Sequence, residues 1–160
     1  MNKFFLFFFI LFFSSFYSPI KATNNEIYGK AKVIDGDTIK INNEKIRLLG
    51  IDAFEIKQTC QRSNGSEYDC GKISKNALIE IISGLPVKCI TKKKDHYKRW
   101  LAVCYVGKLD IAENMVIYGH AVTYKKNTKY KEVEKKAKNI KSGAWEGKFI
   151  LPWDWRKQKR

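Results

Sequence analysis

The sequence predicts a mainly β protein of the α+β class: a five-stranded Greek-key β-barrel of the OB type, packed with about three α-helices. Three observations lead to this fold. Short segments of alternating polar and apolar residues lie on both sides of one helical segment, and two further helical segments follow them. The chain of 160 residues is long enough for one domain with a sizeable core and too short for two. A small barrel covered by helices accounts for that order of elements.

The first three strands are expected at residues 28–34, 38–41 and 45–51, where apolar and polar residues alternate as in a half-buried strand. The segment Asp35-Gly36-Asp37 has the residues of a tight turn, and Asn42-Asn43 makes a second, polar turn. Because antiparallel strands fold back on one another, the charged residues of this region are expected to meet at one edge of the sheet.

The remaining elements follow in a simple order. An irregular loop at 58–71 precedes a helix at 72–83, whose apolar residues have helical spacing. Strands at 87–91 and 100–106 form a hairpin joined by the charged segment 92–99. The chain then continues with a helix at 111–118, an extended piece at 121–124, a helix at 130–141 that closes at 143–145, and a segment at 151–156 that leads to the chain end.

Residues 1–22 are expected to be a cleavable signal peptide, so that the single domain is residues 23–160. Lys3 precedes ten unbroken apolar residues at 4–13, and a cleavage region ends at Ala22. Ten apolar residues suit a signal-peptide core and are too few to cross a bilayer, which needs about 20. An uncleaved membrane anchor is the alternative. The domain is therefore predicted to be secreted or periplasmic, without membrane attachment after cleavage.

The charge of the chain is strongly positive. The formal net charge is +15, and removal of the leader, which holds two lysines and no acid, leaves +13. Such an excess favours a polyanionic partner, either nucleic acid or an anionic surface, with solubility alone as the alternative. A membrane-active cationic protein is disfavoured, because the sequence has no basic amphipathic helix with a broad apolar face.

Four cysteines in an exported chain favour two disulfides over free thiols. Cys89 and Cys104 lie symmetrically about residues 96–97, so a hairpin turning there places them opposite each other. Cys60 and Cys70 then close the other loop. A zinc site is the alternative, but the sequence has no Cys-x-x-Cys and no paired histidine spacing.

Two short acids provide a candidate metal site. Asp37 and Asp52 lie on separate turns, and hard carboxylate oxygens suit Ca²⁺ or Mg²⁺. The backbone carbonyl of Ala53 could complete the set, and Glu55 is a spare carboxylate nearby. Taken alone, an Asp-Gly-Asp segment is more often a plain turn.

Two arginines complete a set of residues for phosphodiester hydrolysis. Arg47 interrupts an apolar strand, and Arg99 ends the basic segment before the fifth strand. Guanidinium groups bind phosphate oxygens through paired hydrogen bonds. A metal and two arginines can stabilise charge on phosphorus while a carboxylate orients or deprotonates water. The alternative is that both arginines are surface ion-pair partners.

Four motifs in order resemble the staphylococcal nuclease (thermonuclease) family over residues 28–155. They are Val33-Ile-Asp-Gly-Asp-Thr-Ile39, Ile46-Arg-Leu-Leu-Gly-Ile-Asp-Ala-Phe-Glu55, Asp95-His-Tyr-Lys-Arg99 followed by x-Leu-Ala, and Gly143-x-Trp145. Each motif is modest singly, and the four together are specific. The resemblance implies an OB barrel, Ca²⁺-dependent cleavage of DNA and RNA, and products with a 3′-phosphate.

The resemblance also assigns roles to residues. Asp37 and Asp52 match the calcium-binding aspartates, Arg47 and Arg99 the phosphate-binding arginines, and Glu55 the glutamate assigned to the attacking water. Ala53 replaces a threonine whose backbone oxygen binds the metal in the family. Phe54 stands where proline is common. Tyr97 resembles a tyrosine beside the nucleotide phosphate, and Tyr124 one that stacks on the base.

The sequence therefore predicts an exported, calcium-dependent, sugar-nonspecific endonuclease. Its partners are DNA and RNA as substrates, and we expect a monomer with no stable protein partner. The alternative is a noncatalytic OB-fold module that binds nucleic acid. Three converging acids favour the nuclease, because they would repel phosphate unless a cation lay among them.

Overall fold

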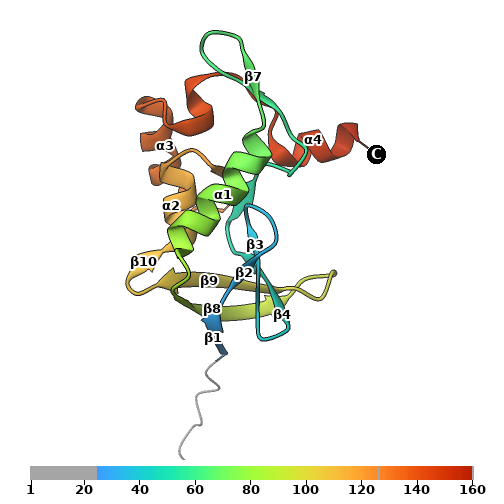
Figure 1. Ribbon diagram of the computed structural model, residues 1–160, viewed down its shortest axis with the longest axis vertical. Helices are drawn as coiled ribbons and strands as arrows, with labels where there is room; N and C mark the ends of the chain where they lie inside the picture. The colour runs from blue at the N-terminus through green and yellow to red at the C-terminus, as the bar shows by residue number, and fades with distance from the viewer. Residues whose placement is uncertain (1–24, 126, 160) are drawn as a thin grey trace, which may run out of the picture.

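The structure is a computed structural model that describes residues 25–125 and 127–159 (Figure 1). The expected signal peptide at residues 1–22 lies outside the described residues. The strands are β1 (Glu26–Lys30), β2 (Lys32–Val33), β3 (Thr38–Ile41), β4 (Glu44–Leu48), β5 (Ile51–Ala53), β6 (Cys60–Gln61), β7 (Glu67–Tyr68), β8 (Pro86–Lys94), β9 (Trp100–Val106), β10 (Leu109–Asp110) and β11 (Ala121–Thr123). The helices are α1 (Cys70–Ile82), α2 (Ile111–Ile117), α3 (Lys131–Asn139), the 3₁₀ helix η1 (Gly143–Glu146) and α4 (Pro152–Gln158).

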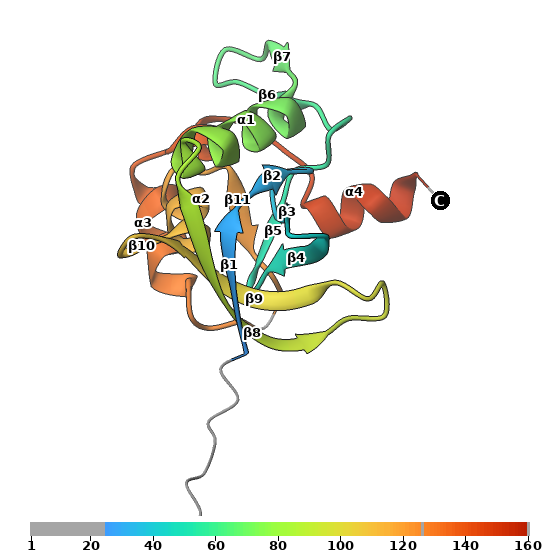
Figure 2. The same cartoon turned by 60° about the horizontal axis from the view of Figure 1, so that its bottom comes forward.

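The main sheet curls on itself. Its strand order is β1-β8-β9-β4-β3-β2, with β10 beside β9, and β4 and β9 are parallel. Because β1 and β2 follow one another in the chain, the order begins and ends in the same segment (Figure 2). The fold is therefore of the predicted OB type, mainly β with helices packed against it.

Two predicted strands are each divided in the structure. The strand expected at 28–34 splits at Ala31, so that β1 pairs with β8 while β2 pairs with β3. The strand expected at 45–51 splits before Ile51, where Gly50 has a φ of +91°. Glycine adopts this backbone conformation readily. The break lets β5 leave β4 and pair with β11, which places Asp52 between the sheet and the helices.

The core fills the curled sheet and the space beneath α1 and α2. Its largest members are fully buried aliphatic side chains and one tyrosine, among them Ile39, Ile41, Ile46, Leu78, Met115 and Tyr130. Ile39 and Ile41 alternate with Lys40 along β3, as the predicted period requires. The burial of these side chains fixes the register of β3 against β4 and hence the residues at their ends.

The structure corrects two sequence predictions. The loop expected at 58–71 contains the short hairpin β6–β7. The segment 151–156, for which no element was predicted, begins the helix α4, so the fold has four α-helices in the described ranges rather than about three. With seven residues, α4 is too short to show a helical period, and Pro152 in its first turn is a common helix start.

Both predicted disulfides are present. Cys89 and Cys104 lie directly opposite each other in the β8–β9 ladder, with their Cα atoms 4.0 Å apart. Cys60 and Cys70 join β6 to the first turn of α1, with a Cα separation of 5.6 Å. No helix in residues 25–125 or 127–159 has the length and apolar character needed to cross a membrane.

Candidate active site

A cavity of about 500 Å³ lies where β3, β4, the residues after β5, the β8–β9 turn and α4 meet. Seven of the predicted site residues line it: Asp37, Arg47, Ala53, Glu55, Tyr97, Arg99 and Tyr124. Asp52, the eighth, is fully buried beneath this surface and does not line the cavity. The structure thus brings together side chains that are separated by up to 87 residues in the sequence.

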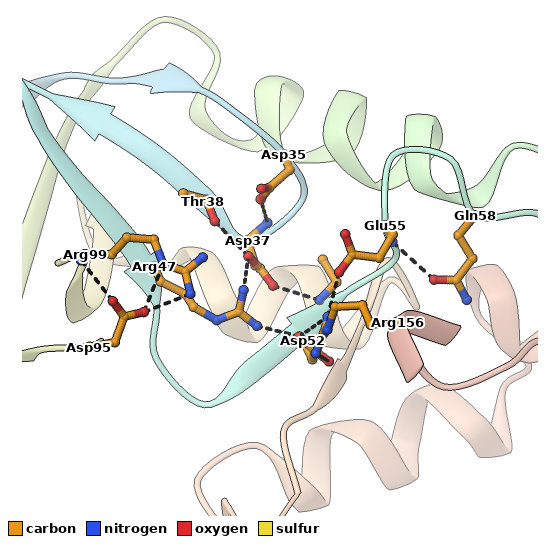
Figure 3. A network of polar contacts seen from close by, with 11 residues as sticks. Asp35, Asp37, Thr38, Arg47, Asp52, Glu55, Gln58, Asp95, Arg99 and Arg156 are labelled. Carbon is orange, nitrogen blue, oxygen red and sulfur yellow. Dashed lines mark hydrogen bonds and ion pairs between the residues drawn. The ribbon is translucent and has the colours of Figure 1, made fainter. Parts of the chain in front are cut away.

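Arg47 joins the two predicted metal-binding aspartates (Figure 3). Thr38 and Arg47 are paired across β3 and β4, so Asp37 lies next to the arginine. Arg47 Nη1 donates to Asp37 Oδ1 at 2.6 Å, and Nη2 donates to Asp52 Oδ1. The backbone N–H of Ala53 donates to Asp37 Oδ2 at 3.1 Å. One guanidinium therefore fixes the spacing of both acids.

Arg156, on α4, is a site residue that the sequence analysis missed. Its Nη2 donates to Asp52 Oδ2 at 2.9 Å, and its Nη1 contacts Asp52 Oδ1 at 3.2 Å and Glu55 Oε1 at 2.6 Å. Figure 3 shows its guanidinium between these two acids. Acids and arginines thus alternate in an unbroken series: Asp37, Arg47, Asp52, Arg156, Glu55. No motif or spacing distinguished Arg156 from the other basic residues near the chain end.

The series has an excess of one negative charge, because three carboxylates face two guanidinium groups. Burial raises the pKa of Asp52, although hydrogen bonds from Arg156 and the charge of Arg47 act in the opposite direction. Asp35, a fourth acid that the sequence analysis treated only as a turn residue, also lines the cavity. Burial, with the nearby charge of Asp37, raises the pKa of Asp35 to about 6.

Glu55 is held by the packing of the loop that carries it. The preceding Phe54 is buried and contacts Phe149 edge to face, with ring centroids 5.1 Å apart. Gly71 lies against the loop so closely that a Cβ there would be 1.7 Å from the carbonyl oxygen of Glu55. The disulfide at the neighbouring Cys70 keeps this glycine in place. Packing of Phe54 thus takes over the stiffening that proline would give at this position.

Gln58 adds a second restraint on the same loop. This fully buried side chain accepts from the Glu55 N–H at 3.1 Å and donates to the Ile150 carbonyl at 2.7 Å. It therefore connects the backbone of Glu55 to the segment that leads into α4. Neither end of this bridge was expected from the sequence.

The other side of the cavity is the turn between β8 and β9. Asp95 accepts hydrogen bonds from Arg99 N at 3.0 Å and Arg99 Nε at 2.9 Å, and its ion pair with Arg99 Nη2 is 2.8 Å long. Burial raises the pKa of Asp95, but these hydrogen bonds outweigh it and lower the pKa overall. Tyr97 is 61% exposed, and the Arg99 guanidinium lies 5.2 Å from its ring centre.

Tyr124 follows β11 at the rim of the cavity. It meets Trp153 of α4 edge to face, with ring centroids 6.1 Å apart. Lys125 Nζ lies 5.2 Å from the Tyr124 ring centre. A basic group beside exposed aromatic rings is the combination that single-stranded nucleic acid uses for stacking and charge neutralisation.

The oxygens with the right chemistry for a cation belong to Asp37, Asp52 and the Ala53 carbonyl, and the carboxylate oxygens of both aspartates already accept hydrogen bonds. Within the described residues, no cluster of three or more histidines, cysteines, aspartates and glutamates is arranged to hold a metal. The two predicted aspartates nevertheless both accept hydrogen bonds from the Arg47 guanidinium, and the Ala53 N–H donates to Asp37. Ca²⁺ binds hard oxygen ligands with an excess of negative charge, and water or phosphate can supply the remaining oxygens. The residues therefore fit this ion by donor type.

The chain is similar in sequence to known nucleases. A family model described as staphylococcal nuclease homologue matches residues 45–147. The succinoglycan biosynthesis protein ExoI of Rhizobium meliloti is 36% identical over 124 residues, which are 74% of this chain and 64% of that protein. An uncharacterized endonuclease of Haemophilus influenzae is 33% identical over 81% of this chain and 72% of its own length.

Two further relatives carry the name nuclease. A thermonuclease of Staphylococcus hyicus is 28% identical over 76% of this chain and 77% of its own length. The probable staphylococcal-like nuclease CAN3 of Oryza sativa is 34% identical over 78% of this chain, which spans 31% of that longer protein. The family match covers more than half of the chain, and it includes Arg47, Asp52, Glu55 and Arg99. The chain therefore belongs to the family of staphylococcal nuclease homologues.

Proposed function

We propose that this chain is an exported, calcium-dependent, sugar-nonspecific endonuclease that hydrolyses DNA and RNA and leaves 3′-phosphates. One observation carries the proposal. Three acids alternate with two arginines at the edge of a cavity that Arg99 closes from the other side. A site that only bound nucleic acid would need the arginines but would be weakened by the acids.

In this mechanism the substrate phosphate lies between the two sides of the cavity. Arg47 and Arg99 donate hydrogen bonds to the phosphoryl oxygens, where negative charge builds as water adds to phosphorus. The bound calcium would be held by Asp37, Asp52 and the Ala53 carbonyl, and it would supply further stabilisation of that charge. Glu55 Oε2, to which Arg156 donates no hydrogen bond, orients the water or takes its proton.

Recognition in the proposed nuclease is electrostatic and aromatic rather than base-specific. Tyr97 lies beside the phosphate, and Tyr124 stacks on a base. The affinity for DNA should fall steeply as salt rises, because lysines and arginines displace counterions from phosphates. Export is supported by the two disulfides, which persist in oxidising compartments.

The test is incubation of the purified chain, beginning at residue 23, with single-stranded DNA, duplex DNA and RNA. We expect cleavage of all three with Ca²⁺, slow cleavage with Mg²⁺ because of its stricter octahedral geometry, and none with chelator. Analysis of product ends should find 3′-phosphates and 5′-hydroxyls. Salt-dependent binding without cleavage under any of these conditions would favour the noncatalytic nucleic-acid-binding module instead.

A further inference from the structure

Arg156 is the one basic residue of α4 that turns into the candidate site. Lys157, its neighbour, pairs with Asp154 on the same helix, and its side chain is 74% exposed. Lys159 lies over the Trp155 ring. Arg156 instead contacts two acids about one hundred residues earlier in the chain, and its side chain is only 34% exposed. The orientation of the helix therefore selects this side chain for the site.

One side-chain bridge joins the loop of Glu55 to the segment that leads into α4, the helix that carries Arg156. The buried Gln58 side chain binds the Glu55 N–H on one side and the Ile150 carbonyl, at the entrance to α4, on the other. Trp153 adds the contact with Tyr124. Because both segments are anchored, an ion pair between them loses less conformational entropy than an ion pair between two mobile surface side chains.

The contacts of Arg156 divide between two functions of the site. On Glu55 it binds Oε1 alone and leaves Oε2 for water. On Asp52 it binds both carboxylate oxygens, one of which Arg47 also binds. A cation that approaches Asp52 must share these oxygens with a guanidinium and meets its positive charge.

We propose that Arg156 is a positioning residue of the site: it holds Glu55 beside Asp52 for hydrolysis and, by the same contacts, weakens cation binding at Asp52. The inference rests on the proposed nuclease function. It predicts two opposite responses to loss of the guanidinium, slower turnover and tighter calcium binding. Neither a purely structural role nor a role as a calcium-site stabiliser produces that pair.

The experiment compares the parent with Arg156→Gln, Arg156→Lys and the control Arg62→Gln. Arg62 pairs with Glu146 at the surface and lies outside the candidate site, so its replacement matches the charge change. The measurements are kcat and KM on a DNA oligonucleotide, calcium affinity by calorimetry without DNA, and the thermal unfolding midpoint.

Arg156→Gln should lower kcat about 10²-fold, the effect typical of a misplaced reacting group, with little change in KM. Its calcium affinity should rise about tenfold, because a positive charge beside the cation is removed. Arg156→Lys should give an intermediate kcat, because an ammonium group lacks the planar fork that spans two acids. Arg62→Gln should match the parent in all three measurements.

Other results would overturn the inference. A raised KM at unchanged kcat would make Arg156 a substrate contact. Weaker calcium binding in Arg156→Gln would make it a support of the metal site. A lower unfolding midpoint with kcat unchanged below that midpoint would leave only a structural role. A parent without activity in Ca²⁺ would instead overturn the proposed function and the positioning role with it.

Discussion

The two sides of the cavity hold their arginines in different ways. On the inner side, Arg47 and Arg156 join three carboxylates, which lie just before β3 (Asp37), in β5 (Asp52) and in the loop that follows β5 (Glu55). On the outer side, Arg99 pairs with Asp95 four residues earlier, within a single turn. Exposure does not distinguish them, since the Arg47 and Arg99 side chains are 17% and 20% exposed.

The difference between the two sides is therefore one of connectivity. Removing an inner arginine leaves two acids from different elements without their shared partner, whereas removing Arg99 leaves one acid that still has backbone donors from Tyr97 and residue 99. We therefore expect the loss of an inner arginine to destabilise the fold more than the loss of Arg99.

The largest expected effect is on turnover in Glu55→Gln. The amide keeps the size of the side chain but loses the base, so turnover should fall about 10²–10⁴-fold while calcium affinity stays near the parental value. Steady-state kinetics and calorimetry measure the two quantities, with the exposed Glu132→Gln as the matched control. Parental turnover in a folded Glu55→Gln protein would remove Glu55 from the chemistry.

Arg47→Met and Arg99→Met compare the two sides directly. Both should lower turnover about 10²–10³-fold, as expected for loss of a donor to the transition state. Only Arg47→Met should greatly lower the free energy of unfolding, by about 3–5 kcal/mol, because it leaves the buried Asp37 without its ion-pair partner and Asp52 with Arg156 alone; Arg99→Met should change it by about 1 kcal/mol or less. Urea unfolding measures this contrast, and equal losses of stability would contradict the division of the site.

The two disulfides lie at different distances along the chain from Glu55, which allows their effects on turnover to be compared. Replacing either pair, Cys60 and Cys70 or Cys89 and Cys104, by serine should lower the free energy of unfolding by about 3 kcal/mol, as chain-entropy arguments give for loops of this length. Turnover at a temperature where both variants are folded should fall only without Cys60–Cys70, because that bond holds Gly71 against Glu55. A matching loss of turnover without Cys89–Cys104 would speak against this explanation.

A small effect is expected on the pH dependence of stability, through Asp95 in the turn between β8 and β9. The pKa of Asp95 is lowered in the folded protein, so its ionised form contributes stability above the unfolded value of about 3.9, and the contribution is lost as pH falls through the folded pKa. Asp95→Asn should therefore lower the unfolding midpoint slightly at pH 6 and converge with the parent near pH 2. Thermal scans across this range test it, with Asp154→Asn, at a partly exposed position on α4, as control. A difference that grows as pH falls would reverse the sign of the argument.

Features that depend on neighbours within one hairpin could be predicted from local sequence patterns. The alternation of β3 and β4 predicted a hairpin whose charged residues meet at one edge, and the structure pairs Thr38 with Arg47 there. The symmetry of residues 89–104 predicted the Cys89–Cys104 pair. Neighbours within a hairpin are fixed by the period of the strand and the length of the turn, both of which can be read locally. The roles of these side chains in catalysis stay predictions.

The positions of Asp52 and Arg156 depend on long-range packing. The break before β5 placed Asp52 beneath the cavity, and the packing of α4 brought Arg156 to Asp52 and Glu55. A seven-residue helix has no period of its own to detect, and its contacts depend on Gln58, Trp153 and the loop tethered by Cys60–Cys70. Such long-range contacts form only when the whole core is assembled. For this reason no local sequence pattern predicted that Arg156 lies in the candidate site.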